Sequence, residues 1–307
     1  MTKGNLYLVW LEWPEKCFRV DAGALRVLRT LVPKGARIVR ARTEAAFLRR
    51  LPEATHAIVW NFKAEWFSRA PRLEVLATPA AGRELVPEEG PDGVRIHFGH
   101  FHGPIIAETV AAFVLGWARG FFALAAHTRS GAAEAAWPRT WLSDKCRTVA
   151  GTKAVVVGYG NIGRAIGVKL ESLGVAVTGV SRHRPVRAAE LKAADWVVLA
   201  LPSTTGTDGY VNAAFLKKLS RKAVLVNIGR GNAVDERALA AALKTGRLAG
   251  AYLDVRKDEP SGTVPLFGAN ARELDGLANC IVSPHSSAFD PNYVANCFKE
   301  LADDGYL

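Results

Sequence analysis

The chain has 307 residues, more than one typical core of about 100–150 residues, so we expect two domains. Apolar residues make up 49% and charged residues 22% of the chain, which excludes an extended disordered polymer. The net charge of +11 is spread without a block of like charges, which favours a solvated basic surface that attracts anionic small ligands over a nucleic-acid-binding arm.

Short apolar runs alternate with helical patterns over the first 80 residues. The expected strands are Leu6–Trp10, Arg37–Val39, Ala57–Trp60 and Leu73–Ala77. The expected helices are Ala22–Leu31, Thr43–Leu51 and Ala64–Arg69. This alternation predicts a parallel sheet covered by helices.

The pattern changes in the middle of the chain. Gly, Pro and charged residues interrupt it from Pro87 to Gly99, and one long Ala-rich helix is expected over Pro104–Ser130, with Gly116 and Gly120 inside it. An irregular stretch is expected over Gly131–Gly151.

A second β/α series follows. Its expected strands are Ala154–Val157, Val175–Val180, Trp196–Ala200, Ala223–Asn227, Ala249–Asp254 and Cys280–Ser283. Its expected helices are Ile162–Leu173, Ala213–Leu219, Glu236–Thr245 and, at the end of the chain, Asn292–Asp303. The fold class is therefore α/β, with two Rossmann-like or flavodoxin-like doubly wound parallel-sheet domains and a cleft between them.

Cysteine usage and hydropathy bear on the compartment. Cys17, Cys146, Cys280 and Cys297 form no CxxC pair and no metal-ligand spacing, so we expect reduced thiols and no metal site. The first residues lack the apolar stretch of a signal peptide, and no apolar run reaches 18 residues. We expect a cytoplasmic protein that binds no membrane.

The sharpest local motif is a glycine-rich turn, Gly158-Tyr-Gly160-Asn161-Ile162-Gly163. It follows an apolar strand and begins a helix, the context in which this spacing predicts dinucleotide binding. Glycines let a pyrophosphate approach the backbone, and the helix start offers free N–H groups. A glycine-rich turn without a ligand is the alternative.

The segment after the next strand bears on the choice of cofactor. An NAD site usually has a carboxylate there for the adenosine ribose, but this chain has Ser181, Arg182, His183 and Arg184. No negative charge repels a 2′-phosphate, and Arg182 and Arg184 are available to pair with one. We therefore expect NADP(H), with NAD(H) and a merely solvated basic loop as the alternative.

Three further segments, LVNIGRGNAVDERAL, AGAYLDVRKDEP and NCIVSPHSSAF, occur in order after the glycine turn. Together these four motifs resemble the D-isomer-specific 2-hydroxyacid dehydrogenase family, strongly over about residues 153–289 and more weakly over 50–120. The resemblance matches Arg230, Glu259 and His285 to the family's catalytic residues. Residues 1–100, completed by 287–307, are expected to form the substrate domain, and 101–286 the dinucleotide-binding domain.

The chemistry of these three residues suits the reduction of a 2-keto acid. Histidine is a natural acid for the carbonyl oxygen because its pKa lies near neutrality, and a neighbouring carboxylate favours the imidazolium. That arrangement fits Glu259 behind His285. Arg230 follows a strand end and offers directed N–H donors for carboxylate and carbonyl oxygens.

The resemblance also implies supporting roles. It matches Asp254 to a contact with the nicotinamide amide, and Pro202 and Thr207 to a loop along the cofactor. It matches Ala81 and Gly82 to backbone amides that receive the substrate carboxylate, with Trp60 and Asn61 nearby to shape specificity. Members of the family are commonly homodimers, with the helix near residues 104–130 in the contact.

Some residues depart from the family pattern. Gly229 stands where Ala is usual, the Ala80–Gly82 stretch has fewer glycines, and Arg83 and Glu84 follow where an aspartate is common. Ser181 and its arginines resemble NADP-using glyoxylate and hydroxypyruvate reductases.

The expected activity is the interconversion of a small 2-keto acid and its D-2-hydroxy acid, with no nucleic-acid partner. Two alternatives stay open at this point. One is a dinucleotide-binding corepressor or sensor with little turnover, and the other is an enzyme resembling phosphite or formate dehydrogenases. The His/Glu pair disfavours formate, because formate enzymes place Gln beside the histidine.

Overall fold

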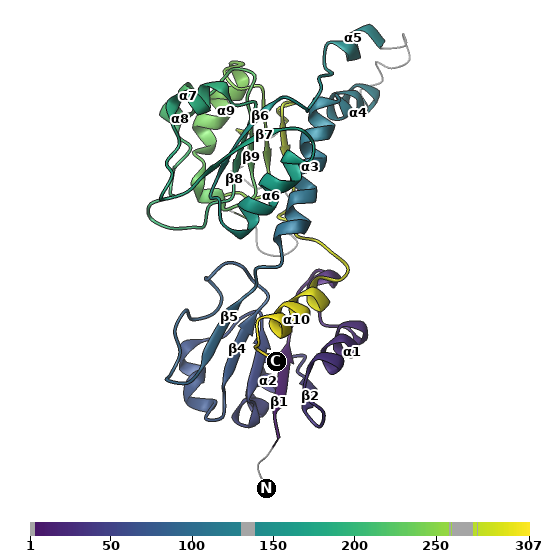
Figure 1. Cartoon of the computed structure of the whole chain (residues 1–307), viewed down its shortest axis with the longest axis vertical. Helices are drawn as coiled ribbons and strands as arrows, with labels where there is room; N and C mark the ends of the chain where they lie inside the picture. Colours follow the sequence, from purple (N-terminus) through teal and green to yellow (C-terminus); the bar gives the residue numbers. More distant parts are fainter. Residues whose placement is uncertain (1–3, 130–138, 258, 260–272, 275) are drawn as a thin grey trace. The chain divides into compact units, whose positions relative to one another are not determined.

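The computed structural model describes residues 4–129, 139–257, 259, 273–274 and 276–307 (Figure 1). The chain divides into two compact units. Unit 1 contains residues 1–102 and 289–307, and unit 2 contains residues 103–288. The last residues of the chain therefore return to the unit formed by the first hundred.

Unit 1 is a five-stranded parallel sheet in the order β2-β1-β3-β4-β5. Its strands are β1 (Leu6–Trp10), β2 (Arg37–Arg40), β3 (His56–Val59), β4 (Val75–Thr78) and β5 (Arg95–Phe98). Its helices are α1 (Ala22–Leu31), α2 (Glu44–Arg50), α10 (Tyr293–Asp303) and the 3-10 turns η1 (Lys16–Phe18), η2 (Leu51–Glu53) and η3 (Ala64–Arg69).

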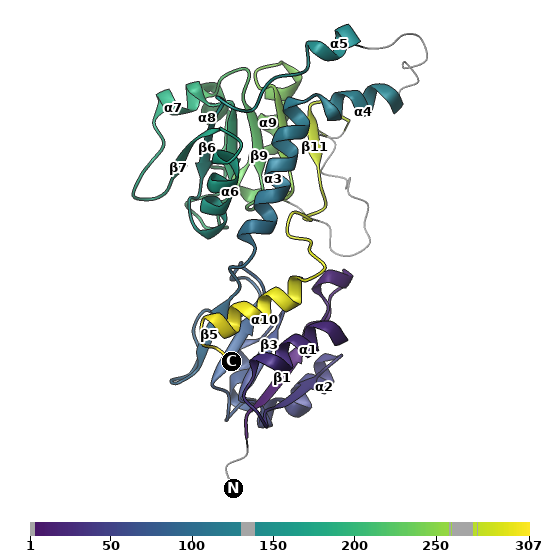
Figure 2. The same ribbon diagram turned by 45° about the vertical axis from the view of Figure 1, so that its right-hand side comes forward.

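Local sequence explains where these helices start and what they cover. The Asp21 carboxylate accepts a hydrogen bond from the Ala24 amide at 2.7 Å and caps α1, and Thr43 caps α2 in the same way. Leu8, Val59 and Leu76 of the sheet lie in one buried cluster. Helix α10 packs beside α1, as both ribbon views show (Figures 1 and 2).

Unit 2 is a six-stranded parallel sheet in the order β11-β10-β9-β8-β6-β7. Its strands are β6 (Lys153–Val157), β7 (Ala176–Val180), β8 (Trp196–Leu199), β9 (Val224–Asn227), β10 (Gly250–Leu253) and β11 (Cys280–Val282). Its helices are α3 (Gly103–Ala118), α4 (Phe121–Arg129), α5 (Arg139–Ser143), α6 (Asn161–Glu171), α7 (Ala188–Ala193), α8 (Ala213–Lys218), α9 (Glu236–Lys244) and the 3-10 turn η5 (Gly231–Ala233).

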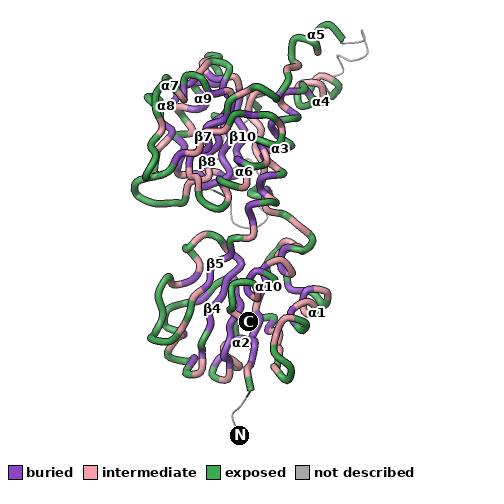
Figure 3. The backbone as a smooth tube through the Cα atoms, viewed as in Figure 1, coloured by how far each residue is buried: buried purple, intermediate pink, exposed green. Residues whose placement is uncertain are grey.

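Both faces of this second sheet are buried. Along β6, Val155 and Val157 lie in the core cluster formed with α8 and α9, whereas Ala154 and Val156 lie in the cluster formed with α3 and α6. The central strands β8, β9 and β10, and β6 after its first residue, are buried, as Figure 3 shows, whereas the edge strands β7 and β11 are mostly of intermediate exposure. Such two-sided burial is typical of parallel sheets and explains their continuous apolar runs.

The single long helix expected over Pro104–Ser130 is wrong, because α3 ends at Ala118 and α4 begins at Phe121 with a bend of 67°. Gly120 has a φ of +71°, and the Ala118 carbonyl accepts the Arg147 amide at 2.7 Å instead of continuing the helix. Residue 130 and the first part of the irregular stretch expected after it, residues 131–138, lie outside the described part of the chain.

Three short elements are absent from the sequence-based expectation, the first being helix α5 (Arg139–Ser143) in the stretch expected to be irregular. Strand β5 falls in the interrupted segment Pro87–Gly99, and helix α7 is the third element that the sequence did not predict. Strand β5 carries Arg95 and His97 at the edge of its sheet, so it lacks the apolar run of a central strand.

Helix length and hydropathy also bear on membrane insertion. Within the described ranges, no single helix has both the length and the apolar character to cross a bilayer, although α3 and α4 taken together pass such a test across their bend.

Candidate active site

The glycine turn lies between β6 and α6, where the strand order of the second sheet reverses. Gly158 has a φ of +92°, and a Cβ there would lie 2.4 Å from the Ala200 carbonyl oxygen. A Cβ at Gly163 would lie 2.2 Å from the Gly158 carbonyl oxygen, whereas one at Gly160 would meet nothing within 4 Å. The turn is therefore close-packed on two sides and open on the third, beside the first amides of α6 (Asn161–Glu171).

The segment after β7 forms a tight turn in which Ser181 and Arg184 exchange two backbone hydrogen bonds of 3.0 and 3.1 Å. The Arg184 guanidinium donates to the Glu190 carboxylate at 2.7 Å and to the Gly179 carbonyl at 3.1 Å. Arg182 is exposed and has no ion pair with any residue that the structure describes. The two arginines are thus unequal, since only Arg184 already has an acidic partner.

The loop after β8 is held by one hydroxyl. Thr207 Oγ1 donates to the Pro202 carbonyl at 2.7 Å and accepts the Thr204 amide at 2.9 Å. These bonds give the Pro202–Gly209 loop a defined shape beside the glycine turn, because β8 pairs directly with β6.

Arg230 follows β9 and stands between two glycines that have no room for a side chain. A Cβ on Gly229 would lie 2.6 Å from the Leu201 carbonyl oxygen, and one on Gly231 would lie 1.9 Å from the Arg256 carbonyl carbon. The backbone at Arg230 is therefore wedged between the loops that follow β8 and β10. Gly229, which departs from the family's usual Ala, supplies one side of this close contact.

Asp254, at the end of β10, is 1% exposed and holds the segment that contains His285. Its carboxylate accepts the Ser286 amide at 2.9 Å, the Ser287 amide at 3.1 Å and the Ser283 hydroxyl at 2.5 Å, and it also accepts the Ser287 hydroxyl. These donors use both carboxylate oxygens. The structure therefore places Asp254 as a clamp on the turn after β11.

His285 adopts a left-handed backbone conformation, with a φ of +52°, which is unusual for a residue other than glycine. Its amide donates to the Asp254 carbonyl at 2.9 Å, so both the backbone and the side chain of Asp254 fix this turn. A constrained turn of this kind costs free energy and persists only when its surroundings hold it.

The His285 side chain is half exposed, and its Nδ1 lies 2.8 Å from Glu259 Oε2. The pKa of His285 is raised, chiefly by this hydrogen bond, while burial and the Arg230 guanidinium act in the opposite direction. The bond to Glu259 leaves Nε2 as the ring nitrogen available to another molecule. Arg230 and Glu259, which were expected from two other segments, thus both act on His285 within unit 2.

Two residues that sequence reasoning missed support Glu259. The Arg256 amide donates to Glu259 Oε1 at 3.1 Å, and the Arg256 guanidinium makes two hydrogen bonds of 2.9 and 2.7 Å with the Glu236 carboxylate. The Lys257 amide also donates to Glu236 at 3.2 Å. Both residues occur inside the motifs used above, as the Glu of Val-Asp-Glu and the Arg of Asp-Val-Arg, but neither motif predicts that they pair.

The expected residues of unit 1 follow two adjacent strands. Asn61 is exposed after β3, and Ala81 and Gly82 form a loop after β4, where Ala81 is exposed. Trp60 is buried instead: its indole N–H donates to the Phe18 carbonyl at 3.0 Å, and its ring stacks on Tyr293. The Trp60 side chain therefore packs inside unit 1.

Residues 111–287 match the model of the NAD binding domain of the D-isomer specific 2-hydroxyacid dehydrogenases. The chain belongs to this family. It is thus a D-2-hydroxyacid dehydrogenase, an oxidoreductase with a nicotinamide dinucleotide cofactor, and the close-packed glycine turn with free helix amides fits a pyrophosphate.

Similar curated proteins are reductases and dehydrogenases of small acids. The dehydrogenase is 31% identical over 275 residues to the glyoxylate reductase of Thermococcus gammatolerans, which covers 83% of this chain and 76% of the relative. It is 28% identical over 230 residues to the glycerate dehydrogenase of Methylorubrum extorquens, which covers 73% and 72%.

Similar solved structures cover nearly the whole chain. The D-isomer specific 2-hydroxyacid dehydrogenase of Xanthobacter autotrophicus, in complex with NADPH and MES, has a TM-score of 0.74 and 26% identity over 98% of this chain and 96% of its own. The NAD-complexed enzyme of Lactobacillus delbrueckii has a TM-score of 0.79 at 17% identity, covering 98% and 96%. The expected family and the two parallel-sheet α/β domains are confirmed.

Proposed function

We propose that the dehydrogenase reduces a small 2-keto acid such as glyoxylate or hydroxypyruvate to the D-2-hydroxy acid, with His285 as the acid and NADPH as the preferred cofactor. The observation that carries this proposal is the 2.8 Å bond between His285 Nδ1 and Glu259 on a turn fixed by Asp254. The names of the similar proteins support the substrate class.

The proposed chemistry assigns one task to each residue. The bound nicotinamide supplies the hydride that adds to the keto carbon. His285 donates the Nε2 proton to the carbonyl oxygen, and Glu259 stabilises the imidazolium before the transfer. Arg230 binds the substrate carboxylate and carbonyl oxygens, since its backbone is held between two loops.

Residues of both units enter the proposal. Unit 2 binds the dinucleotide through Gly158–Gly163, Pro202 and Thr207. The Asp254 carboxylate is buried and already accepts hydrogen bonds from three serines, so its part is to hold the His285 turn and not to contact the nicotinamide amide as the resemblance implied. Unit 1 supplies the Ala81 and Gly82 amides for the substrate carboxylate. Asn61 and Trp60 set the range of substrate side chains. Asn61 contacts the substrate, and Trp60 holds the backbone just before Asn61 through its hydrogen bond to the Phe18 carbonyl.

Absorbance assays of NADPH and NADH consumption with glyoxylate, hydroxypyruvate and pyruvate test the reaction. We expect turnover that His285→Ala lowers by about 100-fold or more while cofactor binding is retained. Binding of cofactor without turnover of any keto acid would reject the reductase assignment and favour a dinucleotide-dependent sensor.

The cofactor preference rests on Arg182, because Arg184 is already paired with Glu190. Arg182→Ala is expected to raise the KM for NADPH by about 10-fold and to leave the KM for NADH unchanged. Arg184→Ala is the matched comparison and should have the smaller effect. Turnover with NADH alone would show that both arginines are only surface charge.

A further inference from the structure

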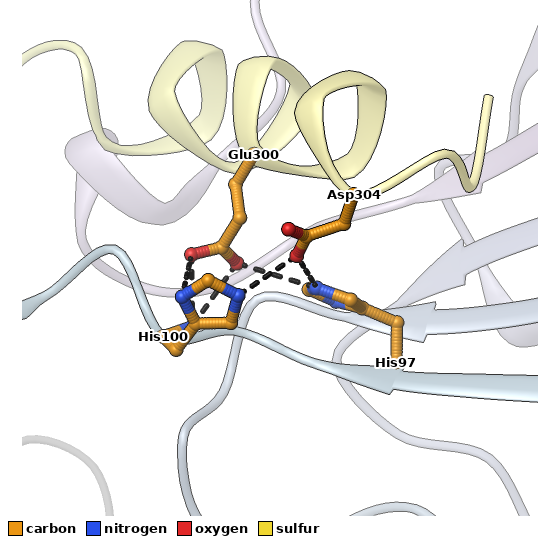
Figure 4. A group of neighbouring side chains, drawn as sticks. All are labelled: His97, His100, Glu300 and Asp304. Carbon is orange, nitrogen blue, oxygen red and sulfur yellow. Dashed lines mark hydrogen bonds and ion pairs between the residues drawn. The ribbon is translucent and has the colours of Figure 1, made fainter. Parts of the chain in front are cut away.

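A second group of ionisable side chains lies in unit 1, distant in sequence from the catalytic motifs. His97 is on β5 and His100 follows it, while Glu300 is on α10 and Asp304 follows that helix. Figure 4 shows the two imidazoles and the two carboxylates facing one another between the edge strand and the helix. His97 and Asp304 are 207 positions apart, so no sequence spacing reveals the group.

The donor atoms are close enough to share one ion. One ligand atom from each of the four residues can be chosen so that all four lie within 4.8 Å of one another. His97 Nε2 lies 3.1 Å from Asp304 Oδ2 and 3.5 Å from Glu300 Oε1. Ligands bound tetrahedrally at about 2.0–2.1 Å lie roughly 3.3 Å apart, so these two separations already suit a zinc ion.

His100 brings the remaining imidazole. Its Nδ1 lies 2.9 Å from Glu300 Oε2 and its Nε2 lies 2.7 Å from Asp304 Oδ2. The His100 amide also donates to both Glu300 oxygens, at 3.0 and 3.1 Å, which fixes that carboxylate in place. The His100 ring is 46% exposed, so it can rotate to offer either nitrogen to an ion.

Burial makes the group more than a surface cluster of charges. The side chains of His97 and Glu300 are only 5% and 7% exposed. His97 Nε2 faces both carboxylates, while its Nδ1 has no hydrogen-bond partner among the described residues. Within this group, only the rings of His97 and His100, when protonated, can balance the charge of the two adjacent carboxylates. A doubly charged cation would neutralise both carboxylates.

We propose that His97, His100, Glu300 and Asp304 form a binding site for a divalent transition-metal ion, Zn²⁺ in the first instance. Two imidazole nitrogens and two carboxylate oxygens are a donor set that zinc accepts, whereas Ca²⁺ and Mg²⁺ prefer oxygen alone. The ion ties α10 to the edge strand β5 and stabilises unit 1. Because His97 Nδ1 lacks an outer partner, micromolar rather than nanomolar affinity is expected.

Titration of the chelator-treated full chain with Zn²⁺, in competition with a chromophoric indicator, tests the site. His100→Asn and Asp304→Asn are the informative variants, because both side chains are partly exposed and their loss leaves the core intact. His127→Asn, in unit 2, is the matched histidine control. Titration with Co²⁺ adds a spectroscopic readout, since coordination by nitrogen and oxygen lacks the thiolate charge-transfer band that binding to a cysteine gives.

We expect one equivalent of Zn²⁺ with micromolar affinity in the native chain and in His127→Asn, and affinity at least about 10-fold weaker in the two site variants. Zn²⁺ should raise the thermal midpoint of the native chain but not that of the variants. Equal binding by all four proteins, a thiolate band with Co²⁺, or no binding at micromolar Zn²⁺ would overturn the proposal and leave the group as an ion-pair network.

Discussion

The behaviour of single residues in this enzyme depends on partners that hold them. His285 is the clearest case, because Glu259 raises its pKa and Asp254 fixes its backbone. The sequence motifs predicted all three as candidate site residues. They were not sufficient to predict the clamp, because hydrogen bonds from Ser283, Ser286 and Ser287 exist only once β10 and β11 lie side by side.

Replacement of Glu259 by Gln tests the histidine–carboxylate pair. In the proposed mechanism reduction requires protonated His285, so activity should fall as pH rises through the pKa of His285. Because Glu259 raises that pKa, Glu259→Gln should move this fall to lower pH and reduce kcat/KM at pH 7.5 by about 10–100-fold. The measurement is the pH profile of kcat/KM. The control is Glu53→Gln, which removes a surface ion pair with Arg50 in unit 1. An unchanged profile would show that another group sets the pH dependence.

Among the helices and strands, the sequence predicted those of the repeated β/α pattern and missed those that depart from it. The buried strands β6, β8 and β9 have continuous apolar runs and were found within one residue of their bounds. The edge strand β5 was missed because its charged residues break that pattern. The break between α3 and α4 was missed because apolar periodicity continues through Gly120, whose positive φ bends the backbone.

Close contact between loops at the carboxyl edge of the second sheet yields a prediction for Gly231. A Cβ there overlaps the Arg256 backbone, so Gly231→Ala must displace the loop that holds Arg230. We expect kcat/KM to fall by about 100-fold, and stability by about 1–3 kcal/mol. Steady-state kinetics and thermal unfolding measure both effects. Gly4→Ala is the control, because its nearest atom is 4.0 Å away; wild-type kinetics in Gly231→Ala would contradict the argument.

Strand β3 carries a titratable group into the middle of the first sheet. Burial lowers the pKa of His56 to about 4, and its Nδ1 lies 2.9 Å from the Thr55 hydroxyl. His56 binds a proton below about pH 6.5 in the unfolded chain but only near pH 4 in the folded chain. The free energy of unfolding therefore decreases as the pH is lowered from about 6.5 to about 4.

The expected loss of stability from His56 alone is about 2 kcal/mol between pH 7 and pH 5. Urea unfolding of the native chain and of His56→Gln at both pH values measures it, because glutamine does not titrate. The native chain should lose more stability on acidification than the variant, by about that amount. Equal losses would place the pH dependence in other groups.

For the whole molecule, the length of the chain predicted two domains and the repeated β/α pattern predicted their class. The metal group of unit 1 could not be predicted in this way, because it needs the last helix to return to β5 after the chain has formed all of unit 2. The net charge of +11 suits anionic substrates and cofactors, but charge is a property of the surface and identifies no partner.

Exposed apolar side chains of unit 2 bear on whether the chain forms a dimer. Leu115, Phe121 and Trp141, on α3, α4 and α5, are 38%, 63% and 37% exposed, and we predict that Phe121 lies in the contact with a second copy of the chain. If the expected homodimer uses this surface, its symmetry places two copies of Phe121 in one interface. Phe121→Asp then costs about 2 kcal/mol at each copy, which raises the dissociation constant about 1000-fold.

Light scattering over a range of concentrations should show monomers for Phe121→Asp and dimers for Val168→Asp, a control on α6 that is 65% exposed. Dimers in both variants would locate the contact elsewhere, and a monomeric native chain would reject the homodimer that the family resemblance implies.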